Sequence, residues 1–332
     1  MSRKNVVDHR FLEAASLKFG ANAVVSNKDL LAFATKGGFA RPNFVFVPEN
    51  KVGHARYRLP NVSGVSASAP TFTVETDEEI EAKLADRFDV MNSMAYATAT
   101  GKNRAVIISG PPGLGKSYGV HQVLSDLEAA GNLKYTVIKG FVRATGLYKT
   151  LWEHKEKGSV VVFDDADSIF FDDTTLNLLK VACDTTHTRV LSWLSETKME
   201  DAEGERLERS FVFEGSIIFI SNYDFDEMIA RGHRLAHHFE AMISRCHYLD
   251  LDMKTAQHYL VRIRQVVKGG MLRDMGFSAQ EETMLLDYIA KNSARLRELS
   301  LRMVLKLANL FKIDPINWVK MASVTCLKNV KN

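Results

Sequence analysis

The amino-acid sequence predicts an α/β protein: a parallel sheet flanked by helices, preceded by a small basic module and followed by a helical domain. Short, continuous apolar segments alternate with helical patterns from residue 104 onward, which is typical of parallel strands covered on both faces. After residue 250 these segments stop and only helical periodicity remains. The 332 residues, 46% hydrophobic and 25% charged, suit about two globular domains.

The first 60 residues are predicted to form the basic module. Ten Lys or Arg stand there against four Asp or Glu, a net charge of +6, whereas the rest of the chain carries −3. Two helices, the second capped by Ser26, precede a basic hairpin, and this order resembles a winged helix. Such a module contacts nucleic acid or protein, and a solvated charged face explains the charge equally well. The expected elements are helices over 11–19 and 26–36 and strands over 44–47 and 55–59.

Three further regions follow the module 1–60. Residues 61–75 are small and polar and include Gly64 and Pro70, which is linker composition. The α/β core is expected over 76–250, opened by a helix that Thr76 caps, and the helical domain over 251–332. Core strands are expected over 105–108, 135–138, 160–163, 217–220 and 248–251. Helical stripes are expected over 120–127, 256–267 and 296–310, with another helix starting at the capping box of Ser278 and Glu281.

The most specific motif is Gly110-Pro-Pro-Gly-Leu-Gly-Lys-Ser117, which fits the P-loop (Walker A) pattern in full. Its glycines let successive backbone N–H groups face phosphate oxygens, and the helix that it opens adds a positive N-terminal end. Lys116 is expected to reach the β- and γ-phosphates of ATP, and the Ser117 hydroxyl to bind Mg²⁺. The expected nucleotide-binding residues are Gly110, Pro111, Pro112, Gly113, Leu114, Gly115, Lys116, Ser117 and Tyr118.

Two later strands run into polar side chains. One ends at Asp164 and Asp165, and burying such a pair costs much free energy unless a cation neutralises it. Asp164 is expected to hold Mg²⁺ and Asp165 to polarise the attacking water. The other strand ends at Asn222, an amide suited to orienting that water, with a simple turn out of the core as the alternative. Asp167 is interpreted as a local capping carboxylate.

The order of these motifs, followed by a helical domain, resembles the AAA+ ATPase superfamily over roughly residues 100–312. In detail the chain is most similar to AAA+ proteins of tailed bacteriophages, through segments 176–180, 243–246 and 296–302. The resemblance implies an AAA+ P-loop NTPase core with a C-terminal helical lid, assembled as a homo-oligomeric ring that we expect to be a hexamer.

The same resemblance implies two arginine roles. Arg245 matches the arginine finger that acts from the neighbouring subunit, and such a residue is worth roughly 10³–10⁵ in rate. Arg302 matches the sensor arginine of the lid, with Arg297 as the alternative. A surface ion pair with Glu298 is the other interpretation of Arg302. One departure concerns Asp165, because the superfamily usually places Glu there. Either the shorter side chain reaches the water differently or hydrolysis is slow.

Two features bear on the substrate. Lys139, Phe141 and Arg143 occupy the position of the superfamily's pore loop, where they would grip a threaded polymer, and packing of Phe141 beneath the loop is the alternative. Segments 189–193 and 210–213 are expected to pair as a hairpin; a long insert here resembles viral superfamily 3 helicases, while the Ser244–Cys246 segment resembles clamp loaders.

Three functions stay open at this point. The first is a phage nucleic-acid motor or loader in DNA replication or recombination, which would bind DNA through residues 1–60 and the pore loop. The second is a protein remodeller, and the third is a slowly hydrolysing, nucleotide-gated scaffold.

Other site types and a membrane location are not supported. No stretch reaches the 18 consecutive apolar residues of a membrane span. Cys183, Cys246 and Cys326 lie far apart in the sequence, without metal-ligand spacing, which favours a reducing compartment. We therefore expect a cytoplasmic protein, in the host cell if it comes from a phage. The ten His residues show no metal-ligand spacing, and neither Ser nor Cys lies in a nucleophile motif.

Overall fold

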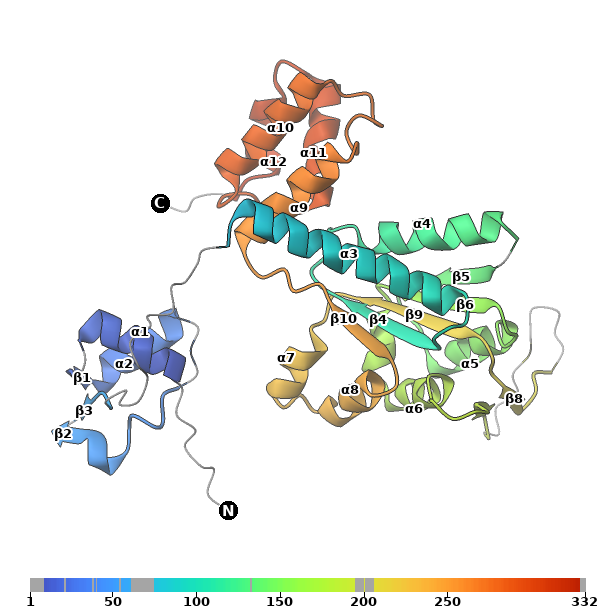
Figure 1. The fold of residues 1–332 in the computed structure, drawn as a ribbon, viewed down its shortest axis with the longest axis horizontal. Helices are drawn as coiled ribbons and strands as arrows, with labels where there is room; N and C mark the ends of the chain where they lie inside the picture. The colour runs from blue at the N-terminus through green and yellow to red at the C-terminus, as the bar shows by residue number, and fades with distance from the viewer. Residues whose placement is uncertain are drawn as a thin grey trace. The chain divides into compact units, whose positions relative to one another are not determined.

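The chain divides into two compact units, Met1–Val74 and Glu75–Asn332. Both units are seen in a computed structural model of the chain (Figure 1). The expected linker, residues 61–75, lies outside the described residues except for Glu75. The structure describes residues 9–20, 22–37, 39, 41–53, 55–60, 75–131, 133–194, 200 and 206–328.

The first unit packs two helices against a three-stranded antiparallel sheet in the order β1-β3-β2. Ser26 caps α2, because its hydroxyl accepts a hydrogen bond from the Asp29 backbone N–H at 3.1 Å. Aromatic rings fill the interior, with Phe11 packed edge-on against Phe33 and Phe44. The elements are α1 (His9–Phe19), β1 (Val24–Ser26), α2 (Asn27–Lys36), the 3₁₀ turn η1 (Pro48–Asn50), β2 (Lys51–Gly53) and β3 (Arg56–Arg58).

The strand expected over 44–47 is wrong. These residues form turns, with Phe44 and Val45 buried, and the Asn50 side-chain amide donates to both of their carbonyl groups. Burial in turns, rather than strand pairing, accounts for the apolar run. β1 was not expected, since three residues are too few to show a period of two. The winged-helix-like plan of two helices and a basic hairpin is nevertheless present.

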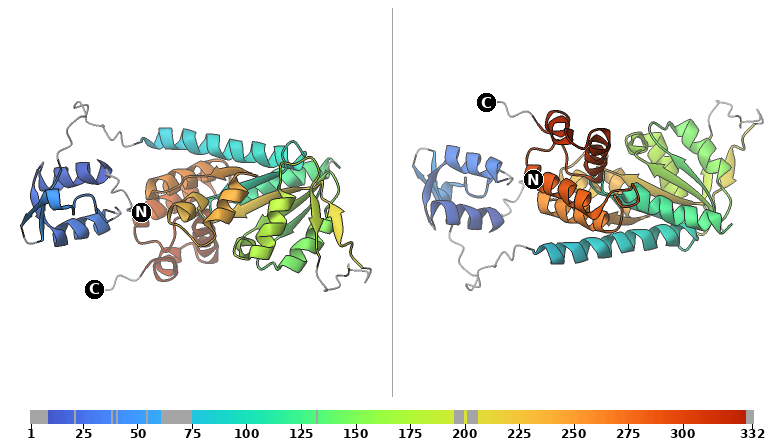
Figure 2. Two further views of the ribbon diagram at one scale, coloured as in Figure 1. Left: turned by 90° about the horizontal axis from the view of Figure 1, so that it is seen from below. Right: turned by 90° about the horizontal axis from the view of Figure 1, so that it is seen from above.

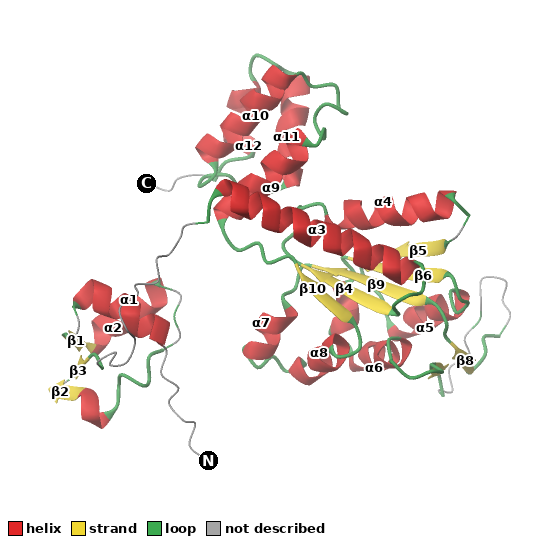
Figure 3. Cartoon of the chain, viewed as in Figure 1, coloured by secondary structure: helices red, strands yellow, loops and turns green. Residues whose placement is uncertain are grey.

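The second unit is built on a five-stranded parallel sheet in the order β10-β4-β9-β6-β5 (Figures 1 and 3). All five core strands expected from the sequence are confirmed. The predicted fold class is confirmed as a parallel α/β core, flanked by helices, with a C-terminal helical lid. The strands are β4 (Ala105–Ser109), β5 (Lys134–Ile138), β6 (Ser159–Asp164), β9 (Ser216–Ser221) and β10 (His247–Asp250).

Alternate residues of each central strand enter cores on opposite faces of the sheet. Val106 and Ile108 of β4 pack with α3 and α4, whereas Ile107 belongs to the core beneath the helices of the other face. Figure 2 shows the long helix α3 running along this unit. One face carries α3 (Asp77–Ala99) and α4 (Lys116–Ala129); the other carries α5 (Ala144–Glu153), α6 (Asp173–Ala182), α7 (Phe225–Ala230) and α8 (Ala236–Ile243).

The lid has one helix more than expected. α12 was missed, and α11 begins at Leu301, so Leu296 and Leu299 of the expected stripe precede the helix. Leu296 instead pairs with Leu327 in an isolated β-bridge. The capping box of Ser278 and Glu281 is confirmed. The lid helices are α9 (Ala256–Lys268), α10 (Ala279–Asn292), α11 (Leu301–Ile313) and α12 (Trp318–Thr325).

Two smaller features complete this unit. The expected hairpin is confirmed as β7 (Val190–Ser192) paired with β8 (Ser210–Val212). Cys183 and Cys246, distant in sequence, meet in the core, where a hydrogen bond from one thiol to the other, together with burial, raises the pKa of Cys246.

Among the described residues, no helix is both long and apolar enough to span a bilayer.

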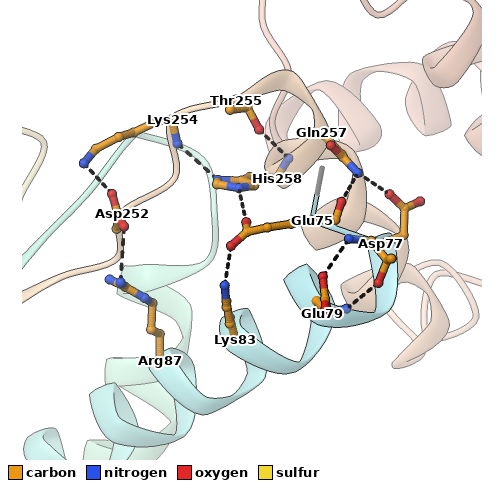
Figure 4. Close-up of polar contacts among 11 residues, drawn as sticks. Glu75, Asp77, Glu79, Lys83, Arg87, Asp252, Lys254, Thr255, Gln257 and His258 are labelled. Carbon is orange, nitrogen blue, oxygen red and sulfur yellow. Dashed lines mark hydrogen bonds and ion pairs between the residues drawn. The ribbon is translucent and has the colours of Figure 1, made fainter. Parts of the chain in front are cut away.

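A polar network joins the first turn of α3 to the connection between core and lid (Figure 4). Glu75 forms ion pairs with Lys83 of α3 and with His258 of α9. Arg87 of α3 pairs with Asp252 at 3.3 Å, and Asp252 has a left-handed backbone with φ 47°. α3 therefore contacts both sides of the joint that links β10 to α9.

Replacing Ser278 with alanine should lower the free energy of unfolding by about 1 kcal/mol, because α10 loses its N-cap hydrogen bond. Urea unfolding followed by circular dichroism measures this change. Ser323→Ala is the control, since that exposed serine lies inside α12 and caps no helix N-terminus. Equal stability of the two variants would contradict the capping assignment.

Candidate nucleotide-binding site

The P-loop connects β4 to α4 at the carboxyl edge of the sheet. Three of its glycines have positive φ angles: 150° at Gly110, 73° at Gly113 and 95° at Gly115. Gly115 is the N-cap of α4 and offers no side-chain cap, so the first backbone N–H groups of the helix stay available to a ligand. A turn of this kind in front of a helix N-terminus favours a phosphate group.

Lys116 is 5% exposed, and its side chain reaches back to the start of the loop. It donates hydrogen bonds to the carbonyl oxygens of Gly110 and Pro111 and, at 2.9 Å, to Oδ1 of Asn222. Burial lowers the pKa of Lys116 to about 8, against the opposing effect of the nearby aspartates. A poorly solvated ammonium of this kind is stabilised by an anion in the loop.

Asp164, at the end of β6, is 1% exposed. Its Oδ1 accepts a hydrogen bond from the Ser117 hydroxyl at 2.7 Å. Its Oδ2 accepts no hydrogen bond of ordinary geometry and faces Nζ of Lys139 at 2.8 Å and Nε2 of His121 at 3.7 Å. A buried carboxylate beside a hydroxyl is the oxygen donor set that Mg²⁺ prefers, so these residues fit the expected metal.

Asp165 and Asn222 lie next to each other at the same edge. Asn222 Nδ2 donates to Oδ1 of Asp165 at 2.7 Å. Asp165 has a left-handed backbone with φ 53°, a conformation that costs free energy in any residue with a side chain and that gathers at functional sites. The Asn222 amide thus bridges Lys116 on one side and Asp165 on the other.

Asp167 does not cap a helix, contrary to the interpretation from the sequence. Its Oδ1 accepts a hydrogen bond from the Ser221 hydroxyl at 2.6 Å, at the end of β9. Burial raises the pKa of this carboxyl group, while the hydrogen bond from Ser221 opposes the change. Asp167 therefore braces the strand end beside Asn222.

The lid closes over the P-loop through its third helix. The Leu301 backbone N–H donates to the Gly113 carbonyl at 2.7 Å. Arg302 follows directly and places Nη2 3.9 Å from Oδ2 of Asp165. The alternative interpretation of Arg302, a surface ion pair with Glu298, is wrong, because Glu298 pairs with Lys306 instead. Arg297, the other sensor candidate, donates to the Thr325 carbonyl away from the loop.

A cavity of about 890 Å³ lies between α3, the P-loop and the lid. Tyr118, expected at the nucleotide, lines it with its side chain 75% exposed. Sequence reasoning missed Arg262, whose guanidinium lies 3.4 Å from the ring centroid of Phe88. Burial lowers the pKa of Arg262 to about 10. No local pattern could reveal this pair, because Arg262 falls outside the apolar stripe of α9 and Phe88 belongs to α3.

Arg245 lies outside this cavity. Its Nη1 donates to the Ala241 carbonyl at 2.8 Å, and its Nε lies 3.7 Å from Oδ1 of Asp184. The structure therefore does not bring Arg245 to the P-loop of its own chain. Phe141 is 74% exposed with Arg143 over its ring, so the alternative that Phe141 packs beneath the loop is wrong.

Comparison with known proteins gives one relative by sequence. A protein of 36.7 kDa from Enterobacteria phage T4, encoded in the nrdC–mobD intergenic region and described as uncharacterized, is 36% identical over 250 residues, which cover 75% of this chain and 76% of the relative. The chain belongs to the family of this phage protein. The kinship with a bacteriophage protein that the sequence suggested is thus confirmed for this phage family. No protein-family profile matches the chain.

Solved structures resemble the phage-family chain distantly. A point mutant of RuvB from Thermotoga maritima is 16% identical, with 75% of this chain and 70% of RuvB covered and a TM-score of 0.41. Domain III of Thermotoga maritima DnaA is 12% identical, with 74% and 87% covered and a TM-score of 0.41. NtrX from Brucella abortus in complex with ATP is 13% identical, with 74% and 54% covered and a TM-score of 0.40. Because these TM-scores lie below 0.5, function and assembly do not transfer from these structures.

Replacing Gly113 with alanine should weaken nucleotide binding about tenfold or more. A Cβ there would lie 2.7 Å from Cβ of Ser300 and would force a side chain into φ +73°, strain of order 1–3 kcal/mol that falls on the contact between loop and lid. Gly131→Ala is the matched control, with the same φ but open space around its Cβ. Titration of a fluorescent ATP analogue compares the two, and equal affinities would refute the role of this contact.

Proposed function

We propose that this chain is an ATPase that assembles as a ring and moves or loads nucleic acid during phage DNA replication or recombination. The observation that carries the proposal is the continuous polar chain at one sheet edge: Lys116 to Asn222 to Asp165, beside the Ser117–Asp164 pair. The host-cell cytoplasm is the proposed place of action, because the relative by sequence is a bacteriophage protein.

Each part of this edge has a chemical task in hydrolysis. The P-loop N–H groups and Lys116 bind the phosphates, while Ser117 and Asp164 hold Mg²⁺. When bound there, Mg²⁺ would neutralise part of the phosphate charge. Asp165 polarises the attacking water, and Asn222 fixes the orientation of that carboxylate. Arg302, now beside Asp165, reaches the phosphates from the lid.

The lid side of the cavity receives the nucleoside. Phe88 presents an aromatic ring, and Arg262 lies against that ring while its Nε donates to the Leu114 carbonyl at 3.4 Å. Phe88 is only 6% exposed because Arg262 covers its ring, so a planar base would lie instead against the apolar lining of the lid side, Val266, Met271 and Leu305. Contacts from both α3 and α9 make nucleotide occupancy and lid position depend on each other.

Nucleic acid is the proposed substrate on two grounds. The β2–β3 hairpin of the first unit exposes Lys51, Arg56 and Arg58, a small positive surface that suits a phosphate backbone. In the second unit, exposed Phe141 with Arg143 against its ring offers a stacking surface and a positive charge, as single-stranded DNA requires.

Steady-state ATP hydrolysis with and without single-stranded DNA, at two salt concentrations, tests this function. We expect strong stimulation that fades as salt rises, because phosphate contacts release counterions. Lys116→Ala should abolish hydrolysis and serves as the background control. A rate that DNA leaves unchanged would favour protein remodelling, and a rate near zero in both conditions would favour the nucleotide-gated scaffold.

The ring proposal rests on Arg245, which cannot serve the site of its own chain and is assigned to the site of a neighbouring subunit in a hexamer. Neither Arg245→Ala nor Lys116→Ala alone should hydrolyse ATP. Mixing the two variants should restore part of the activity, because an intact Arg245 then faces an intact P-loop at some boundaries. A mixture that stays inactive, although size-exclusion chromatography shows mixed rings, would argue against action in trans.

A further inference from the structure

The residue that follows β5 ties the candidate metal ligand to the loop that carries Phe141. In the parallel register of β5 and β6, Ile138 pairs with Phe163, so Lys139 lies across from Asp164. Nζ of Lys139 lies 2.8 Å from Oδ2 of Asp164, while the Ser117 hydroxyl occupies Oδ1. Oδ1 of this buried carboxylate thus has a hydroxyl donor, and the nearest group to Oδ2 is a cation.

Asp164 depends on this cation. A carboxylate that is 1% exposed is costly to keep charged without a counter-charge. The ammonium of Lys116 acts on Asp164 only through space, because its hydrogen bonds go to Gly110, Pro111 and Asn222. His121 lies farther away, at 3.7 Å, and is charged only when protonated.

The backbone next to Lys139 is built to change direction. Gly140 has a φ of +85°, and a Cβ added there would meet open space. Phe141 is 74% exposed, and the Val142 backbone N–H donates to the Ser168 hydroxyl at 3.1 Å. Two anchors, Lys139 on Asp164 and Val142 on Ser168, therefore hold a short segment that includes the exposed aromatic side chain of Phe141.

We propose that Lys139 is a built-in counter-cation that neutralises Asp164 while the metal is absent and leaves it when Mg²⁺ and nucleotide bind. Like charges repel, so Lys139 and a divalent cation compete for one buried carboxylate. Release of Lys139 removes one of the two anchors of the Phe141 segment. This inference deepens the proposed function, on which it rests, by coupling metal occupancy to the substrate-gripping loop through one ion pair.

Coupling of this kind acts in both directions. A polymer that binds the released Phe141 segment favours the state in which Lys139 has left Asp164, and it thereby tightens the binding of Mg²⁺ with nucleotide. The ion pair thus gives a physical route by which substrate stimulates the ATPase.

The full-length variant Lys139→Gln tests the competition. With a fluorescent ATP analogue, we expect the Mg²⁺ concentration for half-maximal binding to fall several-fold, because no internal cation has to be displaced. Lys134→Gln, at the exposed start of β5, is the matched control and should match the parent chain. Weaker binding by Lys139→Gln would show that Lys139 contacts the nucleotide instead, and an unchanged Mg²⁺ dependence would show no competition; either overturns the inference.

A reporter at Phe141 tests the release without relying on a fold that Lys139→Gln could disturb. In Phe141→Trp, tryptophan emission should shift when Mg²⁺ joins a non-hydrolysable ATP analogue, and not with the analogue and EDTA. Emission that ignores Mg²⁺ while the nucleotide binds would overturn the inference and leave the proposed function standing. Failure of the parent chain to bind nucleotide at all would instead refute the proposed function, and the inference with it.

Discussion

The second unit depends on keeping one negative charge, that of Asp164, inside the protein. The carboxylate is 1% exposed at the end of a central strand, where a charge persists only with partners. Ser117 satisfies one oxygen and so requires the start of α4 beside the end of β6. Parallel strands make this possible, because their carboxyl ends share one edge of the sheet.

Strand order explains how the remaining polar groups meet. β9 lies between β4, which leads into the P-loop, and β6, which leads into the aspartates. Asn222 follows β9 directly. Its side-chain oxygen lies toward Lys116 of the P-loop, and its side-chain nitrogen lies toward Asp165. The amide therefore accepts from Lys116 and donates to Asp165, a pairing that an ionised carboxylate in this position would not reproduce, because it has no donor.

Features governed by local sequence were predictable. The five core strands, the capping box at Ser278 and the P-loop depend on periodicity, short-range hydrogen bonds and glycine conformation, all of which a single segment encodes. The sequence also predicted that Asp164, Asp165 and Asn222 lie close together, because they stand at the carboxyl ends of two strands of one parallel sheet. The sequence-based choice of Arg302 over Arg297 agrees with the geometry, since Arg302 lies beside Asp165.

Features that depend on contacts between distant segments were not predictable. Arg262 and Phe88 meet only because α9 crosses α3, and Lys139 finds Asp164 through strand register. At residues 44–47 a strand was predicted where the structure has turns, because the apolar residues there are buried without pairing in a sheet. α12 was missed because no helix was expected after the third lid stripe. In the structure, Trp318 of α12 packs against Phe311 and Tyr288.

The polar network around Glu75 ties the start of the second unit to both of its parts. Glu75 contacts α3 through Lys83 and α9 through His258, next to the connection that contains Asp252. A change in the angle between core and lid would therefore break or stretch contacts at Glu75, the first described residue after the first unit. The entry point of the chain into the second unit is thus sensitive to the position of the lid.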